Sequence, residues 1–215
     1  MNLSTNLWEA NRDLADAARA HRFVRGIADG TLALVSFRAY VEQDAFFLES
    51  FARAYALALA HTSAGDDLRA FFELLAGVME ELDLHEDYAR RWGTRLSGVE
   101  PEAATLAYTD FLLATAALQD IGQTCAAMTP CMRLYAHLGQ ALAEGEIQED
   151  NPYAEWVETY SDPGFEALAA RLESLLDNYA ASPRIRATYR RAMQLEVGFF
   201  EAAALKGESY AGSET

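Results

Sequence analysis

Hydrophobic residues recur along nearly the whole chain at spacings of three and four, which is the period of an α-helix with one buried face. No two-residue alternation persists long enough to indicate a sheet. β-Branched residues are sparse, alanine and leucine abound, and the five prolines stand near expected helix starts. The pattern therefore predicts an all-α protein.

Glycines, prolines and capping residues divide the periodic stretches into separate helices. No internal repeat, low-complexity tract or linker interrupts them, so we expect a single-domain helical bundle over residues 1–206 and a loose tail at 207–215. The first helices are expected at about 3–21, 22–29, 34–60 and 66–92. Another begins at 101 and continues with a break near Gly122. The last are expected at 130–145, 152–160, 161–179 and 183–206.

The 215-residue chain carries a net charge of −16, which makes nucleic acid and anionic membranes poor partners. That charge indicates a solvated acidic surface or, alternatively, steering of cationic ligands. We see no secretory signal and no apolar run near the ~20 residues that span a bilayer. Two cysteines do not build a disulfide framework, so we expect a cytoplasmic protein with reduced thiols.

Asp44 is the first unusual residue, because the other four residues on its helical face could all be plain core. A buried carboxylate is costly unless it is paired or hydrogen-bonded. Asp44 therefore either ties helices together or belongs to a functional site. The face is formed by Tyr40, Gln43, Asp44, Phe47 and Phe51.

Cys131 follows Pro130, a residue that starts a helix or kinks a longer one because it lacks an N–H. At a helix start, Cys131 would lie in the first turn, where free N–H groups and the helix dipole stabilise a thiolate. Tyr135 follows at i+4 and stands over the same face. The alternative is a buried structural cysteine beside a core tyrosine, and for Cys125 we expect packing alone.

Glu196 precedes Phe199 and Phe200 in the last expected helix. Either it is exposed, or it points inward as a second carboxylate whose raised pKa suits general acid–base work. Trp156 and Tyr160, at i and i+4, are either core residues or aromatic walls of a site.

A metal site is weakly indicated around His85, which follows Glu81 by four residues. A di-iron bundle needs Glu-x-x-His on two helices, and the other histidines lack that companion. We therefore expect a solvated charged face around His85, no metal and no cofactor. The chain also lacks a glycine-rich phosphate loop and a hydrolase elbow.

Several short motifs follow one another in order between about Leu7 and Leu205. They are His21-x-Phe23, Gly30-Thr31-Leu32, Tyr40-x-x-Gln43-Asp44-x-x-Phe47-Leu48, Glu81-x-x-x-His85-x-x-Tyr88, Ala107-Tyr108-Thr109, Pro130-Cys131-x-x-x-Tyr135-Ala136-x-x-Gly139, Tyr153-x-x-Trp156-x-x-x-Tyr160-Ser161 and Glu196-x-x-Phe199-Phe200. Their order and spacing resemble the TenA family, also called thiaminase II or aminopyrimidine aminohydrolases.

The resemblance implies a heme-oxygenase-like helical fold, usually a homotetramer, without heme or metal. It implies a small-molecule aminopyrimidine substrate, with hydrolysis of 4-amino-5-aminomethyl-2-methylpyrimidine to the hydroxymethyl pyrimidine in thiamin salvage. Many members also cleave thiamin. Cys131 places the chain in the branch with a nucleophilic cysteine.

The resemblance also implies roles for individual residues. Cys131 would add to the pyrimidine ring, and Glu196 would move protons to the leaving amine and from water. Asp44 would hold a ring nitrogen and the 4-amino group, and Tyr160 would bond the opposite ring nitrogen. The flat substrate would lie among the aromatic residues Phe47, Tyr108, Tyr135 and Phe199.

Four residues depart from the usual pattern of the family: Arg22, Thr129, Arg133 and Phe200. Arg133 and Phe200 are expected to reshape the pocket mouth or its back wall, which leaves the preferred substrate open. Two alternatives keep the fold but change the function. One is a non-catalytic pyrimidine-binding or regulatory protein, and the other is a metal-dependent oxidase.

Overall fold

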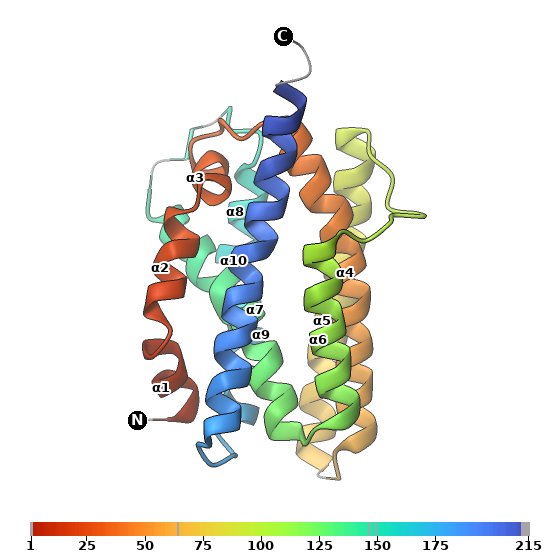
Figure 1. Cartoon of the computed structure of the whole chain (residues 1–215), viewed down its shortest axis with the longest axis vertical. Helices are drawn as coiled ribbons and strands as arrows, with labels where there is room; N and C mark the ends of the chain where they lie inside the picture. The colour runs from red at the N-terminus through yellow and green to blue at the C-terminus, as the bar shows by residue number, and fades with distance from the viewer. Residues whose placement is uncertain (1, 64, 146, 149, 212–215) are drawn as a thin grey trace.

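A computed structural model describes residues 2–63, 65–145, 147–148 and 150–211, and within these ranges all regular structure is helical. The predicted all-α fold is confirmed (Figure 1). The helices are α1 (Leu3–Glu9), α2 (Arg12–Ala20), α3 (Arg22–Ala28), α4 (Leu34–His61), α5 (Gly65–Trp92), α6 (Ala103–Leu118), α7 (Ile121–Ala143), α8 (Ala154–Ser161), α9 (Pro163–Leu176) and α10 (Pro183–Ala211).

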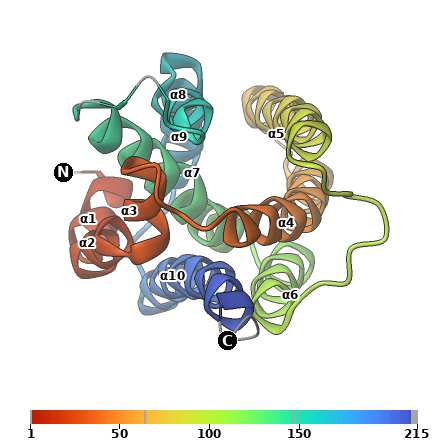
Figure 2. The ribbon, with the colours of Figure 1, turned by 90° about the horizontal axis from the view of Figure 1, so that it is seen from above.

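Helix α7 lies at the centre of the bundle and contacts α4, α6, α8, α9 and α10 (Figure 2). Most of its side chains are buried, and many of them are small. At Gly139 an added Cβ atom would lie 2.3 Å from the carbonyl carbon of Tyr160. Only glycine therefore lets α8 approach α7 this closely, and this contact fixes the position of Tyr160.

The amino-terminal region forms two helices where one was expected over 3–21. The side chain of Asn11 donates to the carbonyl of Leu7 at 2.8 Å, and its oxygen accepts from Arg190 at 3.1 Å. A side-chain bond to the backbone competes with the helical ladder, so α1 ends and α2 begins at this point. The resulting bend lets α1 contact α9 while α2 packs against α10.

Helices α6 and α7 are separated at Gln119 and Asp120, slightly before the predicted break at Gly122. The carboxylate of Asp120 accepts from the backbone N–H of Gln123 at 2.8 Å and caps α7.

Pro130 does not start a helix, contrary to one of the two outcomes expected for it. It lies inside α7, which continues for thirteen residues beyond it to Ala143. The hydroxyl of Thr129 donates to the carbonyl of Cys125 at 2.7 Å in the turn before the proline. Packing against five neighbouring helices stabilises α7 enough to retain a residue that ends most helices.

The expected tail at 207–215 is wrong in its first part, because α10 continues to Ala211. Residues 212–215 lie outside the described ranges. A Cβ atom on Gly207 would meet Ser36 Oγ at 2.5 Å, so this part of α10 packs closely against α4. Among the described helices, none combines the length and apolar character that crossing a membrane requires.

Candidate active site

Six helices contribute polar side chains to one interior cluster, which we call the polar cluster. Most of these side chains are almost completely buried: exposure is 3% for Asp44, 2% for His85 and 1% for Glu196. Buried groups of this kind require partners, and the bonds below supply them. The polar cluster consists of Asp44 on α4, Glu81 and His85 on α5, Tyr108 on α6, Cys131 on α7, Tyr160 on α8 and Glu196 on α10.

His85 bridges Asp44 and its own helix. Its Nε2 donates to Oδ2 of Asp44 at 2.7 Å, and its Nδ1 donates to the backbone carbonyl of Glu81 at 2.9 Å. Both ring nitrogens face acceptors, which favours the imidazolium form. Burial by itself lowers the pKa of His85, but the hydrogen bond and charge of Asp44 outweigh it, and the pKa is raised.

Glu81 accepts a hydrogen bond from the Tyr160 hydroxyl at 2.6 Å. Burial and the nearby negative charge of Asp44 raise the pKa of Glu81 to about 7. The carboxyl group therefore exchanges its proton near neutral pH, where general acids and bases are most effective.

Glu196 interacts with Tyr108 and with Cys131. The Tyr108 hydroxyl donates to Oε1 of Glu196 at 2.6 Å. Burial raises the pKa of Glu196 to about 8, and the Tyr108 hydrogen bond and the nearby Cys131 thiol partly offset that effect. A carboxylate close to a thiol can take its proton, so the two groups can serve as a base and its nucleophile.

No helix N-terminus stabilises the thiolate of Cys131, because this residue lies in the middle of α7. The expected stabilisation of its thiolate by a helix dipole is therefore wrong. Burial, and then the negative charges of Glu196 and Glu81, raise the pKa of Cys131 well above its ordinary value. The thiolate must form by proton transfer within the site.

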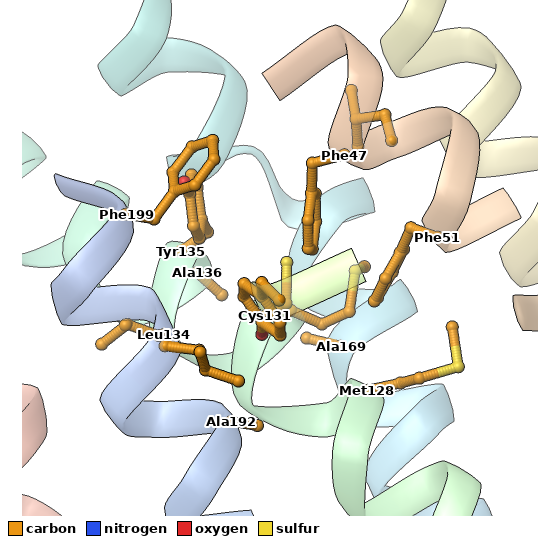
Figure 3. Packing of buried hydrophobic residues seen from close by; sticks show 14 of the residues in the cluster. Phe47, Phe51, Met128, Cys131, Leu134, Tyr135, Ala136, Ala169, Ala192 and Phe199 are labelled. Atoms are coloured by element: carbon orange, nitrogen blue, oxygen red, sulfur yellow. The ribbon is translucent and has the colours of Figure 1, made fainter. Parts of the chain in front are cut away.

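Aromatic side chains lie around Cys131, and Figure 3 shows Phe47 and Phe51 on one side and Tyr135 and Phe199 on the other. Phe47 packs against Tyr108 with ring centroids 4.8 Å apart and against Phe199 at 6.0 Å. Tyr135 and Tyr160 meet edge to face at 4.7 Å. Flat, rigid walls of this kind suit a planar ring.

The structure brings together all the candidate residues that the sequence indicated, namely Asp44, Phe47, Tyr108, Cys131, Tyr135, Tyr160, Glu196 and Phe199, in one buried region. Trp156 also belongs to this buried region, and its indole N–H donates to the Tyr40 hydroxyl at 3.3 Å.

The expected solvated face around His85 is wrong for His85 and Glu81. Leu74, Val78 and Tyr88 form an apolar stripe on α5, and with Glu81 and His85 between the last two the positions follow at spacings of three and four. Glu81 and His85 fall in register with that stripe, so the same helical period that located the core predicts both of them inside it. The exposed position was expected only because Glu81 and His85 are charged.

The departures from the family pattern lie outside the polar cluster. Arg133 forms paired hydrogen bonds with Glu173, the shorter at 2.6 Å, and with Glu166 at 2.8 and 2.9 Å, and so joins α7 to α9. Arg133 is not among the residues that line the groove between α5, α8 and α9. Phe200 stacks on Phe23 at 5.6 Å and contacts Tyr135 at 5.7 Å, which places it behind the aromatic wall.

A surface groove of about 470 Å³ between α5, α8 and α9 reaches the edge of the polar cluster. Its lining includes Glu81 and Met132, the neighbour of Cys131. Across the described ranges, no group of three or more His, Cys, Asp or Glu side chains is arranged to hold a metal ion.

Residues 8–206 match the TENA/THI-4/PQQC family. The aminopyrimidine aminohydrolase of Halalkalibacterium halodurans is 35% identical over an alignment that covers 84% of this chain and 83% of that protein. The bifunctional TH2 protein, mitochondrial, of Arabidopsis thaliana is 37% identical over 83% of this chain. The alignment covers only 33% of the plant protein, so the chain spans about a third of that relative's length.

Solved structures agree with the family match. A TenA homologue from P. horikoshii OT3 superimposes with a TM-score of 0.88 at 26% identity, covering 96% of this chain and all of the other. A Shewanella denitrificans domain with a heme oxygenase-like fold superimposes with a TM-score of 0.74 at 12% identity over 98% and 95% of the two chains. The predicted heme-oxygenase-like fold is confirmed, and this chain belongs to the TENA/THI-4/PQQC family.

Proposed function

We propose that this protein is an aminopyrimidine aminohydrolase that acts in thiamin salvage. In this reaction, water replaces the amine of 4-amino-5-aminomethyl-2-methylpyrimidine. The observation that carries the proposal is the burial of the Cys131 thiol together with the carboxyl groups of Asp44 and Glu196 in one region that aromatic side chains also line. The proposal is supported by the 35% identity to a bacterial relative named for this activity.

The substrate ring lies between the Phe47 side and the Tyr135 side of this region. Asp44 accepts a hydrogen bond from the 4-amino group, and it holds the adjacent ring nitrogen when that nitrogen carries a proton. Tyr160 bonds the opposite ring nitrogen. Because Asp44 is held at Oδ2 by His85, its orientation is set before the ligand arrives.

Cys131 supplies the nucleophile. Glu196 takes the proton of the thiol, and the sulfur adds to the pyrimidine ring with formation of a C–S bond. Electrons of the adduct then expel the amine from the exocyclic methylene carbon as ammonia, which takes the thiol proton from Glu196 and leaves as ammonium. Water adds to that carbon after giving a proton to Glu196, and loss of the thiolate restores the aromatic ring.

The substrate itself promotes formation of the thiolate. With a pKa of about 8, Glu196 keeps its proton in most molecules of the free protein at neutral pH. The aminomethyl group of the substrate arrives as an ammonium ion, whose positive charge favours the carboxylate form of Glu196. The base is therefore generated where the leaving amine lies.

The test is hydrolysis of 4-amino-5-aminomethyl-2-methylpyrimidine, with the product followed by chromatography. Cys131→Ser is expected to lower turnover by at least about 1000-fold while the helical circular dichroism signal is retained. Cys125→Ala is the matched control, because Cys125 is also buried in α7 but is outside the polar cluster. Turnover of Cys131→Ser close to that of the wild type would remove Cys131 as the nucleophile.

A further inference from the structure

Glu81 is the member of the polar cluster that also lines the surface groove. Its carboxyl group accepts from Tyr160 at 2.6 Å on the cluster side. The side chain is only partly buried, in contrast to Asp44 and Glu196. Glu81 therefore connects the interior site to a place where protons exchange with water.

The hydrogen bond between Tyr160 and Glu81 restricts what Tyr160 can offer a ligand. The hydroxyl has one hydrogen atom, and in the free protein that atom points to Oε1 of Glu81. An unprotonated ring nitrogen only accepts hydrogen bonds, as a carboxylate does. An ionised Glu81 competes with that nitrogen for the single hydrogen, whereas a protonated Glu81 donates to the Tyr160 oxygen and leaves the hydroxyl hydrogen for the nitrogen.

We infer that Glu81 is a positioning residue that supplies a proton, through the hydroxyl of Tyr160, to the pyrimidine nitrogen when Cys131 adds to the ring. The inference rests on the proposed function. It gives Glu81 a role distinct from that of Glu196, because Glu196 serves the thiol and the leaving amine. The two carboxyl groups contact different tyrosines on different helices.

The proton and electron changes balance over one turnover. The unsubstituted ring carbon, the one open to attack, adjoins the nitrogen that faces Tyr160. As the sulfur electron pair forms the C–S bond, the C=N π pair moves to nitrogen, which takes the Tyr160 proton while Tyr160 takes that of Glu81. When the thiolate leaves, the C=N bond reforms and the proton returns by the same route, so Glu81 is regenerated.

The charges around Glu81 set the pH at which it can act. The groups that face it are Asp44 from α4, His85 from its own helix, Cys131 from α7 and Tyr160 from α8. In the groove it is flanked by Glu80 on α5, Glu158 on α8 and Asp162, which caps α9. Negative charge dominates this set, and together with burial it keeps the carboxyl protonated in a large share of molecules near neutral pH.

The experiment measures kcat and KM for the aminopyrimidine between about pH 5 and about pH 9 in the wild type, Glu81→Gln and Glu80→Gln. Wild-type kcat is expected to fall on the alkaline side as Glu81 loses its proton around its pKa of about 7. Glu81→Gln keeps a hydrogen-bonding group but no transferable proton. We expect its kcat to drop about 10- to 100-fold, with KM nearly unchanged and the alkaline fall absent. Glu80→Gln, exposed in the same groove, should retain the wild-type profile.

Two outcomes would overturn the inference, and they separate it from the proposed function. If Glu81→Gln keeps the wild-type kcat and its alkaline fall, the proton route is wrong while Cys131-dependent turnover still supports the hydrolase. If the folded wild type turns over no aminopyrimidine, both proposals fail together.

If Glu81→Gln does not fold, a second variant tests the same proton route. Tyr160→Phe removes the hydroxyl through which the proton passes and is expected to abolish the same alkaline fall in kcat. Where both single variants fold, combining them should lower kcat no further than Tyr160→Phe alone, because members of one route are not additive. An alkaline fall that persists in Tyr160→Phe, or a double variant whose loss is the product of the single losses, would overturn the inference.

Discussion

The imidazole of His85 holds the carboxylate of Asp44 at 2.7 Å, across the interface between α4 and α5, with at most 5% of either side chain exposed. The bond engages Oδ2 of Asp44, so the other carboxylate oxygen is the one that we expect to receive the 4-amino group of the substrate. The histidine thus joins the two longest helices of the first half of the chain and orients a residue of the site.

Replacing His85 by alanine is expected to lower the free energy of unfolding by about 3–5 kcal/mol, because Asp44 would be left as an unpaired buried charge. The pKa of His85 is raised on folding, so its contribution is fully present below its ordinary pKa of 6.5 and is lost as pH rises through the folded value. Urea unfolding at several pH values measures both effects. His61→Ala, at the exposed end of α4, is the control.

A difference between His85→Ala and the wild type that grows with rising pH would contradict this assignment. So would a loss no larger than that of the His61 control.

Replacing Asp44 by asparagine is expected to weaken aminopyrimidine binding about 10- to 100-fold. The new amide group presents donors where the 4-amino group also donates, and a hydrogen bond to a charged acceptor is worth about 1.5–3 kcal/mol. Isothermal titration calorimetry in the Cys131→Ser background measures the affinity without turnover. An unchanged Kd would remove Asp44 from the substrate contacts.

The sequence predicted the long helices to within a few residues wherever local signals agreed. The helix predicted at 34–60 is observed as Leu34–His61, and the one predicted at 66–92 as Gly65–Trp92. In these stretches, helical period and the breaks after them indicate the same limits. The candidate site followed from residues whose polarity conflicts with an apolar surrounding, such as Asp44 and Glu196.

The remaining features depend on contacts between distant parts of the chain. Pro130 carries a local signal to begin a helix, and packing around α7 overrides it. His85 is charged and follows Glu81 in an acidic stretch, so its burial becomes evident only when Asp44, 41 positions earlier, is placed beside it. Likewise, the partners of Arg133 lie 33 and 40 positions later, on α9. Helical period alone does not define which helices are neighbours.

Replacing Arg133 by alanine is expected to reduce stability and leave the chemistry nearly unchanged. The guanidinium is 15% exposed and bonds Glu166 and Glu173, so its loss leaves Glu173 without its donor and Glu166 with only Gln140 at the contact of α7 with α9. We expect a decrease of about 1–3 kcal/mol in the free energy of unfolding. A kcat/KM within about 3-fold of the wild type is also expected, because Arg133 is outside the polar cluster. A large loss of turnover at unchanged stability would show that Arg133 acts on the substrate.

We expect the protein to be a homotetramer, with contacts through the exposed apolar face of α5. Phe72 and Met79 are 65% and 51% exposed, one heptad apart on that face. Large apolar side chains grouped on a surface are typical of subunit interfaces. Light scattering at micromolar concentration should give four times the chain mass, and Phe72→Asp should lower it.

Leu118→Asp is the matched control for this prediction, because Leu118 is 76% exposed but lies at the end of α6. A monomeric wild type would contradict the tetramer. A Phe72→Asp variant that stays tetrameric would place the contact elsewhere.

Replacing Glu196 by glutamine is expected to stabilise the protein at alkaline pH while abolishing turnover. Burial raises the pKa of Glu196 from its ordinary 4.5 to about 8, so the folded state binds the proton more tightly than the unfolded state does. Wild-type stability therefore falls as pH rises between these values, and glutamine, which carries no charge, avoids this loss. We expect equal unfolding free energies near pH 4 and an advantage of a few kcal/mol for the variant near pH 9. Urea unfolding at both pH values measures the difference, with the exposed Asp110→Asn as control. A difference that stays constant with pH would mean that Glu196 does not titrate as a buried carboxyl, and it could not then be the base that takes the thiol proton.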